Sequence, residues 1–156
     1  TVESGYSGGR ISNPTYREVS SGITGHAEVI EFTYNPAEIS YEDLVKIHLT
    51  THNPTTLNQQ GADMGTQYRS VIFYRNEEEK TIALNAIKEL KATYDDMIVT
   101  EVAMFEHFYP AEDYHQNYYN ENNIKPSACR SIRFKNDFVK FFTAGREILL
   151  LINAAH

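Results

Sequence analysis

The chain has 156 residues, of which 41% are hydrophobic and 22% charged, and this balance indicates one globular domain with a core rather than a disordered chain. Its formal net charge of -7 argues against nucleic acid and anionic membranes as partners, because both bind basic surfaces. The single cysteine, Cys129, excludes an internal disulfide and a multi-cysteine zinc site, and we expect a reducing, cytoplasmic location. The longest apolar run, Ile148 to Ile152, is too short to cross a bilayer, and no signal peptide is recognisable.

The first motif is GYSGG at residues 5–9, which matches G-x-S-x-G, the pattern around the serine nucleophile of many hydrolases. That pattern requires a strand before a sharp turn and a helix directly after it. Here only Thr1 to Ser4 precede the motif, and the segment that follows carries Pro14 and no helical periodicity. We therefore do not expect Ser7 to be a nucleophile, and the glycines predict a tight backbone turn instead.

The next two elements are predicted by periodicity and by a helix cap. Residues 27–34 read AEVIEFTY, and their alternation is typical of a strand. Ser40 with Asp43 forms a capping box for a helix that carries Leu44, Ile47 and His48 and ends before Pro54.

A polar loop and a second strand–helix pair follow. Residues 53–68 read NPTTLNQQGADMGTQY and predict a loop, and residues 69–75 predict a buried strand. Asn76 with Glu79 forms a second capping box. The helix that it opens presents one apolar face, made of Ile82, Ala83, Ala86, Ile87 and Leu90.

The remainder of the chain predicts one strand and two helices. Residues 97–104 read as a strand, and Pro110 suits the first turn of a helix that continues to about Asn120. Residues 136–153 predict a final apolar helix. Because strands alternate with helices, we expect a sheet covered by helices.

Glu28 occupies an unusual place in the strand predicted over residues 27–34. Alternation puts Glu28 on the same face as Ile30, Phe32 and Tyr34. Burial at the end of an apolar face disfavours the charged carboxylate, and a carboxyl that keeps its proton can act as an acid. The other interpretation, a solvated carboxyl at a frayed strand end, stays open from sequence alone.

The neighbouring triplet His26-Ala27-Glu28 resembles the H-x-E of zinc deaminases, which also need a downstream P-C-x-x-C. The chain has no P-C-x-x-C, so this interpretation fails. We expect His26 to be a turn or capping residue.

Phenols are unusually frequent, with eleven tyrosines and no tryptophan. Tyr6, Tyr16 and Tyr68 lie in or beside predicted loops, where a phenol can donate a hydrogen bond into a pocket, although a buried tyrosine is usually a core residue. Asp63 in the 53–68 loop is by itself an ordinary turn residue. Four further aromatic residues fall at helical spacing, which usually means packing: Tyr114, His115, Tyr118 and Tyr119.

Taken together, five motifs in this order resemble one family, the A-type peptide methionine sulfoxide reductases, which reduce the S epimer of methionine sulfoxide. The motifs are GYSGG, NPTYREV, SGITGHAE, HNPTTLNQQGADMGTQYRS and FYPAEDYHQNYY. The resemblance is close over residues 2–120. It implies an α+β fold, a two-layer sandwich in which helices cover a mixed sheet around a ferredoxin-like core. It also implies that Tyr6, Glu28, Asp63 and Tyr68 surround the sulfoxide, with the Tyr6 hydroxyl directed at its oxygen.

The chain departs from this family at its cysteines. The family's nucleophile lies in a Gly-Cys-Phe-Trp motif, which would stand upstream of Thr1 and is absent here. Because the chain does not begin with Met, we expect residues 1–156 to be an N-terminally incomplete reductase domain. Ser20 stands where many members have a cysteine. Cys129 resembles the resolving cysteine, although Ala128 replaces the tyrosine that commonly precedes it.

The family chemistry implies a thiolate that attacks the sulfoxide sulfur while Glu28 protonates the oxygen and Tyr6 and Tyr68 stabilise the developing charge. The resulting sulfenic acid condenses with a second cysteine, and thioredoxin or dithiothreitol reduces the disulfide. No metal or organic cofactor is implied. An alternative remains open, a catalytically silent relative that binds methionine sulfoxide or a partner protein.

Overall fold

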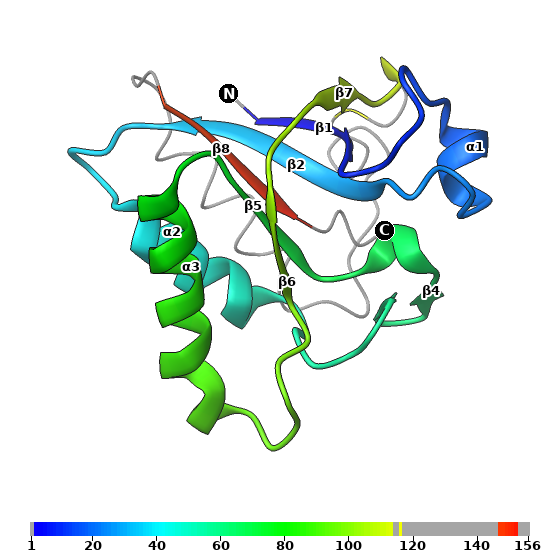
Figure 1. Ribbon diagram of the computed structural model, residues 1–156. Helices are drawn as coiled ribbons and strands as arrows, with labels where there is room; N and C mark the ends of the chain where they lie inside the picture. Colours follow the sequence, from blue (N-terminus) through cyan, green and yellow to red (C-terminus); the bar gives the residue numbers. More distant parts are fainter. Residues whose placement is uncertain (1, 114–115, 117–146, 153–156) are drawn as a thin grey trace.

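The computed structural model describes residues 2–113, 116 and 147–152 (Figure 1). Its main feature is a six-stranded sheet with the order β6-β5-β8-β2-β1-β7, beside a two-stranded sheet of β3 and β4. The strands are β1 (Val2–Ser7), β2 (Ala27–Tyr34), β3 (Gln59–Gln60), β4 (Asp63–Met64), β5 (Val71–Tyr74), β6 (Glu101–Met104), β7 (Phe108–Pro110) and β8 (Glu147–Ile152). The helices are α1 (Tyr16–Ser20), α2 (Tyr41–Thr51) and α3 (Glu77–Leu90), with short 3-10 turns η1 (Thr66–Tyr68) and η2 (Lys91–Thr93).

The sheet is mixed. Strands β5 and β6 are parallel, whereas β1 is antiparallel to β2 and β7, and β8 is antiparallel to both β2 and β5. Strand β2 lies between β1 and β8, and its bounds confirm the strand predicted over residues 27–34.

Helices α2 and α3 begin where their caps predict. The Ser40 side chain accepts a hydrogen bond from the Asp43 backbone N–H at 3.1 Å, and Asn76 accepts one from the Glu79 N–H at 2.9 Å. Each cap satisfies a backbone donor that the first helical turn leaves open. The predicted apolar face of α3 is confirmed, because Ala83 and Ala86 are buried in the core.

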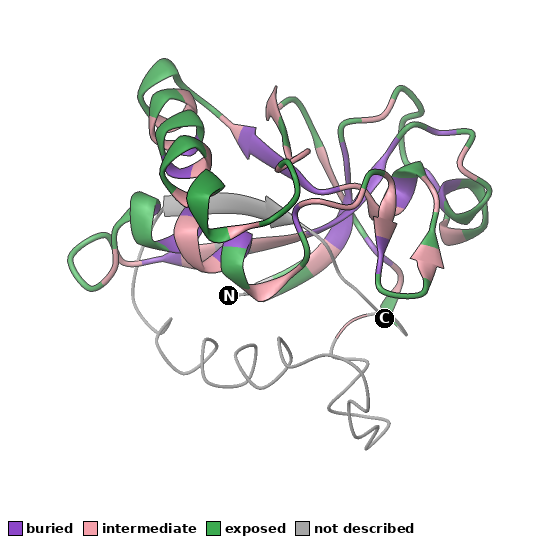
Figure 2. Cartoon of the chain, turned by 90° about the horizontal axis from the view of Figure 1, so that it is seen from below, coloured by how far each residue is buried: buried purple, intermediate pink, exposed green. Residues whose placement is uncertain are grey.

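The core lies between the sheet and these two helices, which pack against the same face (Figure 1). In Figure 2, buried residues gather along the strands and on the helix faces that meet them, while the outward helix turns are exposed. The buried residues of this cluster are Ala27, Val29, Tyr34, Tyr41, Leu44, Val45, Leu49, Val71, Ile72, Phe73, Ala83 and Ala86.

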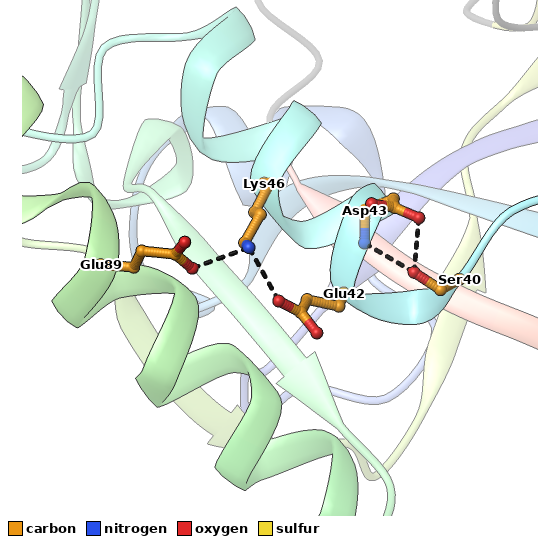
Figure 3. A network of polar contacts seen from close by, with 5 residues as sticks. All are labelled: Ser40, Glu42, Asp43, Lys46 and Glu89. Atoms are coloured by element: carbon orange, nitrogen blue, oxygen red, sulfur yellow. Dashed lines mark hydrogen bonds and ion pairs between the residues drawn. The ribbon is translucent and has the colours of Figure 1, made fainter.

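An ion-pair network joins α2 to α3 at the surface (Figure 3). The Lys46 ammonium lies 2.7 Å from the Glu42 carboxylate one turn earlier and 2.7 Å from the Glu89 carboxylate on α3. Hydrogen bonds to Glu42 and then Glu89 raise the pKa of Lys46. Because such exposed pairs are well solvated, the packing of the apolar faces contributes more to holding the two helices together.

Several sequence predictions are corrected. Pro110 ends strand β7 and does not open a helix, because the pairing of β7 with β1 extends through Gly5 and Pro110. Residues 147–152, predicted as part of a final helix, form strand β8 between β2 and β5. The strand predicted over 97–104 is shorter, since β6 begins at Glu101, and the predicted 53–68 loop contains β3, β4 and η1. The rest of the 136–153 helix lies outside the described residues.

Candidate active site

Glu28 lies near the start of β2 and is buried, with 4% of its surface exposed. Its Cα partner on β1 is Tyr6, so the two side chains share one face of the sheet. The structure therefore favours the buried interpretation of Glu28 over the solvated strand end. At this end of the sheet lie α1 and the β3–β4 region, away from the α2–α3 layer (Figure 1).

Three groups act electrostatically on Tyr68, the last residue of η1. Burial raises the pKa of the Tyr68 phenol, and Glu28, Asp63 and Tyr16 raise it further. Because charge interactions weaken with distance, the three groups that raise this pKa lie in the same part of the molecule as Tyr68. In the sequence, Tyr16 stands out only as a phenol beside a predicted loop, because its place near Tyr68 depends on the fold.

One contact joins the Tyr16 helix to the Tyr68 turn, and a second packs this helix against β1. The Gln67 side chain donates a hydrogen bond to the Ser20 carbonyl at the end of α1, at 3.1 Å. Val19 of α1 is buried against Tyr6 and Ala111, with Tyr16 and Tyr109 packed around them. The phenols of α1 and η1 therefore come together through tertiary contacts.

Asp63 is carried by the small β3–β4 hairpin, in which it pairs with Gln60. The Gly65 N–H donates to the Asn58 carbonyl at 2.9 Å and closes this hairpin. Gly65 has a φ of +147°, a conformation that favours glycine, and a Cβ there would collide with the Gln67 side chain. The chain can therefore turn sharply from Asp63 into η1.

Tyr6 is buried, and its hydroxyl donates to Glu112 Oε2 at 2.9 Å. The other oxygen of the same carboxylate accepts from the backbone N–H of Tyr16 at 2.7 Å. Glu112 thus connects β1 to the first turn of α1. Glu112 carries no signal in the sequence, because Tyr6 and Glu112 are far apart in the chain and no local pattern links them.

The GYSGG motif forms the end of β1 and the turn after it. The Ser7 hydroxyl is buried and donates to the His107 carbonyl at 2.8 Å, and no helix follows until α1. Gly8 has a φ of +80°, and a Cβ there would collide with the Phe73 ring. The predicted glycine turn is confirmed, and the strand–turn–helix arrangement that a G-x-S-x-G nucleophile requires is absent at residues 5–15.

His26 stabilises this glycine turn, as the turn-residue interpretation predicts. Its Nδ1 accepts a hydrogen bond from the Gly9 N–H at 3.0 Å, so that nitrogen carries no proton. Its Nε2 lies 2.7 Å from the Ile11 carbonyl, which can only accept, so Nε2 is the protonated nitrogen. Both ring nitrogens are used structurally.

Other residues of interest lie outside the described part of the chain. Cys129 is one of them, as are Tyr114, His115, Tyr118 and Tyr119. Among the described residues no three His, Cys, Asp or Glu side chains gather as a metal would require. Over the same residues, no helix has the length and apolar character needed to span a membrane.

The family described as "Peptide methionine sulfoxide reductase" matches residues 1–144. The chain belongs to this family. The peptide methionine sulfoxide reductase MsrA of Saccharolobus solfataricus is 47% identical over 132 residues, which cover 85% of this chain and 74% of that protein. The MsrA of Vesicomyosocius okutanii is 50% identical over 142 residues, covering 91% of this chain and 83% of that protein.

Solved structures of reductases have the same fold. Reduced Mxr1 from Saccharomyces cerevisiae gives a TM-score of 0.77 at 33% identity, covering 83% of this chain and 75% of that one. Methionine sulfoxide reductase A of Corynebacterium diphtheriae gives a TM-score of 0.71 at 33% identity, covering 81% of this chain and 66% of that one. The expected α+β class and the family resemblance are confirmed.

Proposed function

We propose that the reduction of methionine S-sulfoxide typical of this family takes place around Glu28, Tyr16, Asp63 and Tyr68. The observation that supports this site is the convergence of Glu28, Asp63 and Tyr16 on Tyr68, from three separate segments of the chain. A buried carboxyl beside two phenols offers what sulfoxide reduction requires, a proton donor and hydrogen-bond donors at the oxygen.

The chemistry proposed begins with attack of a cysteine thiolate on the sulfoxide sulfur. As the sulfur–oxygen bond breaks, Glu28 supplies a proton, and the oxygen is transferred to the cysteine as a sulfenic acid, leaving methionine. A second thiol then displaces water from the sulfenic acid and forms a disulfide. External dithiol, from thioredoxin or dithiothreitol, returns the enzyme to its reduced state. Cys129 is the thiol that this chain contributes, as the resolving cysteine.

Within this site, Tyr68 and Tyr16 are the phenols proposed to hydrogen-bond the sulfoxide oxygen. The Tyr6 hydroxyl hydrogen is engaged by Glu112, so we assign Tyr6 to the support of Tyr16 rather than to the substrate. Asp63 also acts on Tyr68, and we assign it to the polar border of the site.

Two broader expectations belong to the same proposal. Strands β2 and β5 are both antiparallel to β8 and are linked through α2, a split β-α-β arrangement that supports a ferredoxin-like core. A lone cysteine suits the reducing conditions of the cytoplasm, where thioredoxin would be available.

The direct test is an assay of the complete gene product with the separate S and R epimers of peptide methionine sulfoxide and excess dithiothreitol. We expect consumption of the S epimer alone. Binding of the S epimer without turnover would favour the silent relative, and consumption of the R epimer would overturn the assignment of stereochemistry.

A further inference from the structure

A hydrogen bond between two side chains joins the ends of the segment that carries Asp63 and Tyr68. His52 caps the C-terminal end of α2, and Ser70 stands directly before β5. His52 Nε2 lies 2.6 Å from Ser70 Oγ, so residues 53–69 leave and return to the core at a single point. We call this contact the His52–Ser70 bridge.

The hydrogens of the bridge have one consistent arrangement. His52 Nδ1 lies 2.6 Å from the His48 carbonyl, which can only accept, so Nδ1 carries the ring proton. His52 Nε2 must then accept the Ser70 hydroxyl hydrogen. The Ser70 oxygen is left to accept from Thr100 Oγ1, which lies 2.8 Å away. The bridge is thus a directed chain of bonds, and Ser70 is only 3% exposed.

From its first end, the bridge leads to Asp63. Asn53, next to His52, makes two backbone hydrogen bonds with the Gln60 side chain. Gln60 accepts from the Asn53 N–H at 3.2 Å and donates to the Asn53 carbonyl at 3.3 Å. Gln60 is the Cα partner of Asp63 in the β3–β4 hairpin. Movement of His52 would therefore be passed to Asp63 through two adjoining contacts.

From its second end, the bridge leads to Tyr68, two residues before Ser70. Between them, Arg69 donates to the Thr66 carbonyl at 2.9 Å and to Glu101 at 2.9 Å. The Tyr68 N–H donates to the Gly65 carbonyl at 3.0 Å. The backbone of η1 is therefore fixed relative to Ser70, and the direction of the Tyr68 phenol depends on where Ser70 is held.

We propose that the His52–Ser70 bridge is a positioning pair for sulfoxide reduction, holding Tyr68 and Asp63 at the distances that the reaction requires. The inference rests on the proposed function, since it acts through residues of that site. Neither His52 nor Ser70 touches the substrate in this proposal. A displacement of about 1 Å in a reactive arrangement can cost about 10²-fold in rate, so a small loosening of η1 would be measurable.

The test compares Ser70→Ala with a matched control, Tyr94→Phe, in the complete gene product. Tyr94 donates its hydroxyl to the Leu49 carbonyl, so the control also removes a side-chain hydrogen bond at the C-terminal end of α2, but away from residues 53–69. Both variants should unfold at a lower urea concentration than the wild type, because each removes at least one buried or partly buried hydrogen bond. We expect kcat to fall about tenfold in Ser70→Ala with KM changed less than about threefold, and both constants to be unchanged in Tyr94→Phe.

A second measurement separates this inference from the proposed function. Backbone amide hydrogen exchange over residues 59–68 reports the order of the segment without any turnover, and it should be faster in Ser70→Ala than in Tyr94→Phe. If kcat and exchange in Ser70→Ala match those of the control, the positioning role is overturned while the reductase assignment stands. If the wild type reduces no sulfoxide, the proposed function fails, and with it the catalytic part of this inference, whatever the exchange rates show.

Discussion

The imidazole rings of His48 and His52 stack at the end of α2, with their centroids 4.2 Å apart and their planes inclined by 26°. Burial, and then the neighbouring His52, lowers the pKa of His48 well below its usual range. Burial lowers the pKa of His52 to about 4, partly offset by its hydrogen bond to the His48 carbonyl. The folded protein therefore holds both rings neutral at pH values where an unfolded chain would protonate them.

This pair predicts a loss of stability in mild acid. Below a pH of about 6.5 the two imidazoles bind protons in the unfolded state but stay neutral in the folded state. The free energy of unfolding therefore falls as the pH is lowered. The fall continues toward the folded pKa of His52 near 4, and for this residue it amounts to at most about 3 kcal/mol. Urea unfolding of His48→Leu at pH 7 and pH 5 should show a smaller difference than the wild type. His107→Gln, at an exposed histidine, is the control and should keep the wild-type difference. If the unfolding free energy changed equally between pH 7 and pH 5 in all three proteins, the prediction would be contradicted.

Glu28→Gln should slow the chemical step of sulfoxide reduction in the complete gene product. Glutamine keeps the size of the side chain and a hydrogen-bond donor but supplies no acidic proton, so a loss of about 10²–10⁴-fold is expected. The loss should shrink at low pH, where solvent can supply the proton. Single-turnover rates measured across pH check this. Near wild-type rates at every pH would show that Glu28 is a structural carboxyl, and Asp63 would then be the next candidate for the proton donor.

Tyr6→Phe and Glu112→Gln should have coupled effects, because both change the hydrogen bonds that the Glu112 carboxylate accepts. The carboxylate of Glu112 accepts from Tyr6 through one oxygen and from the Tyr16 N–H through the other, whereas an amide has only one accepting oxygen. Each single variant should lower kcat/KM and the unfolding free energy. In a double-mutant cycle the combined loss should fall short of the sum by about 0.5–3 kcal/mol. Strict additivity would show that Tyr6 and Glu112 act separately.

Glu3→Lys should stabilise the protein. Glu3 and Glu31 are Cα partners on β1 and β2, so two like charges face each other. Burial and then Glu3 raise the pKa of Glu31, with an opposing effect from Arg75, so this site loses stability as the pH rises through the folded pKa of Glu31. At pH 7 the unfolding free energy of Glu3→Lys should rise by about 0.5 kcal/mol. Asp96→Lys makes the same change of net charge at an exposed position, and an equal gain there would attribute the effect to net charge instead.

Local sequence patterns were enough to predict the elements whose conformation depends on their own residues. Alternation predicted β2, and the Ser40 and Asn76 caps predicted the starts of α2 and α3, because a cap and an apolar stripe lie within a few residues of one another. The order of the motifs was likewise enough to predict the family, because that order can be seen in the sequence without any tertiary contact.

The tertiary structure decided what depends on distant partners. Residues 147–152 are as apolar as a buried helix, and they form a strand because β2 and β5 present free edges on either side of them. Pro110 ends a strand because β1 offers it a neighbour, and its missing N–H needs no partner there. The same reason applies to the site: Tyr16 meets Tyr68, and Tyr6 meets Glu112, only after the sheet has brought together segments up to 106 residues apart. Hydrogen bonds between side chains so far apart leave no periodicity in the sequence, because their geometry is set by packing rather than by spacing along the chain.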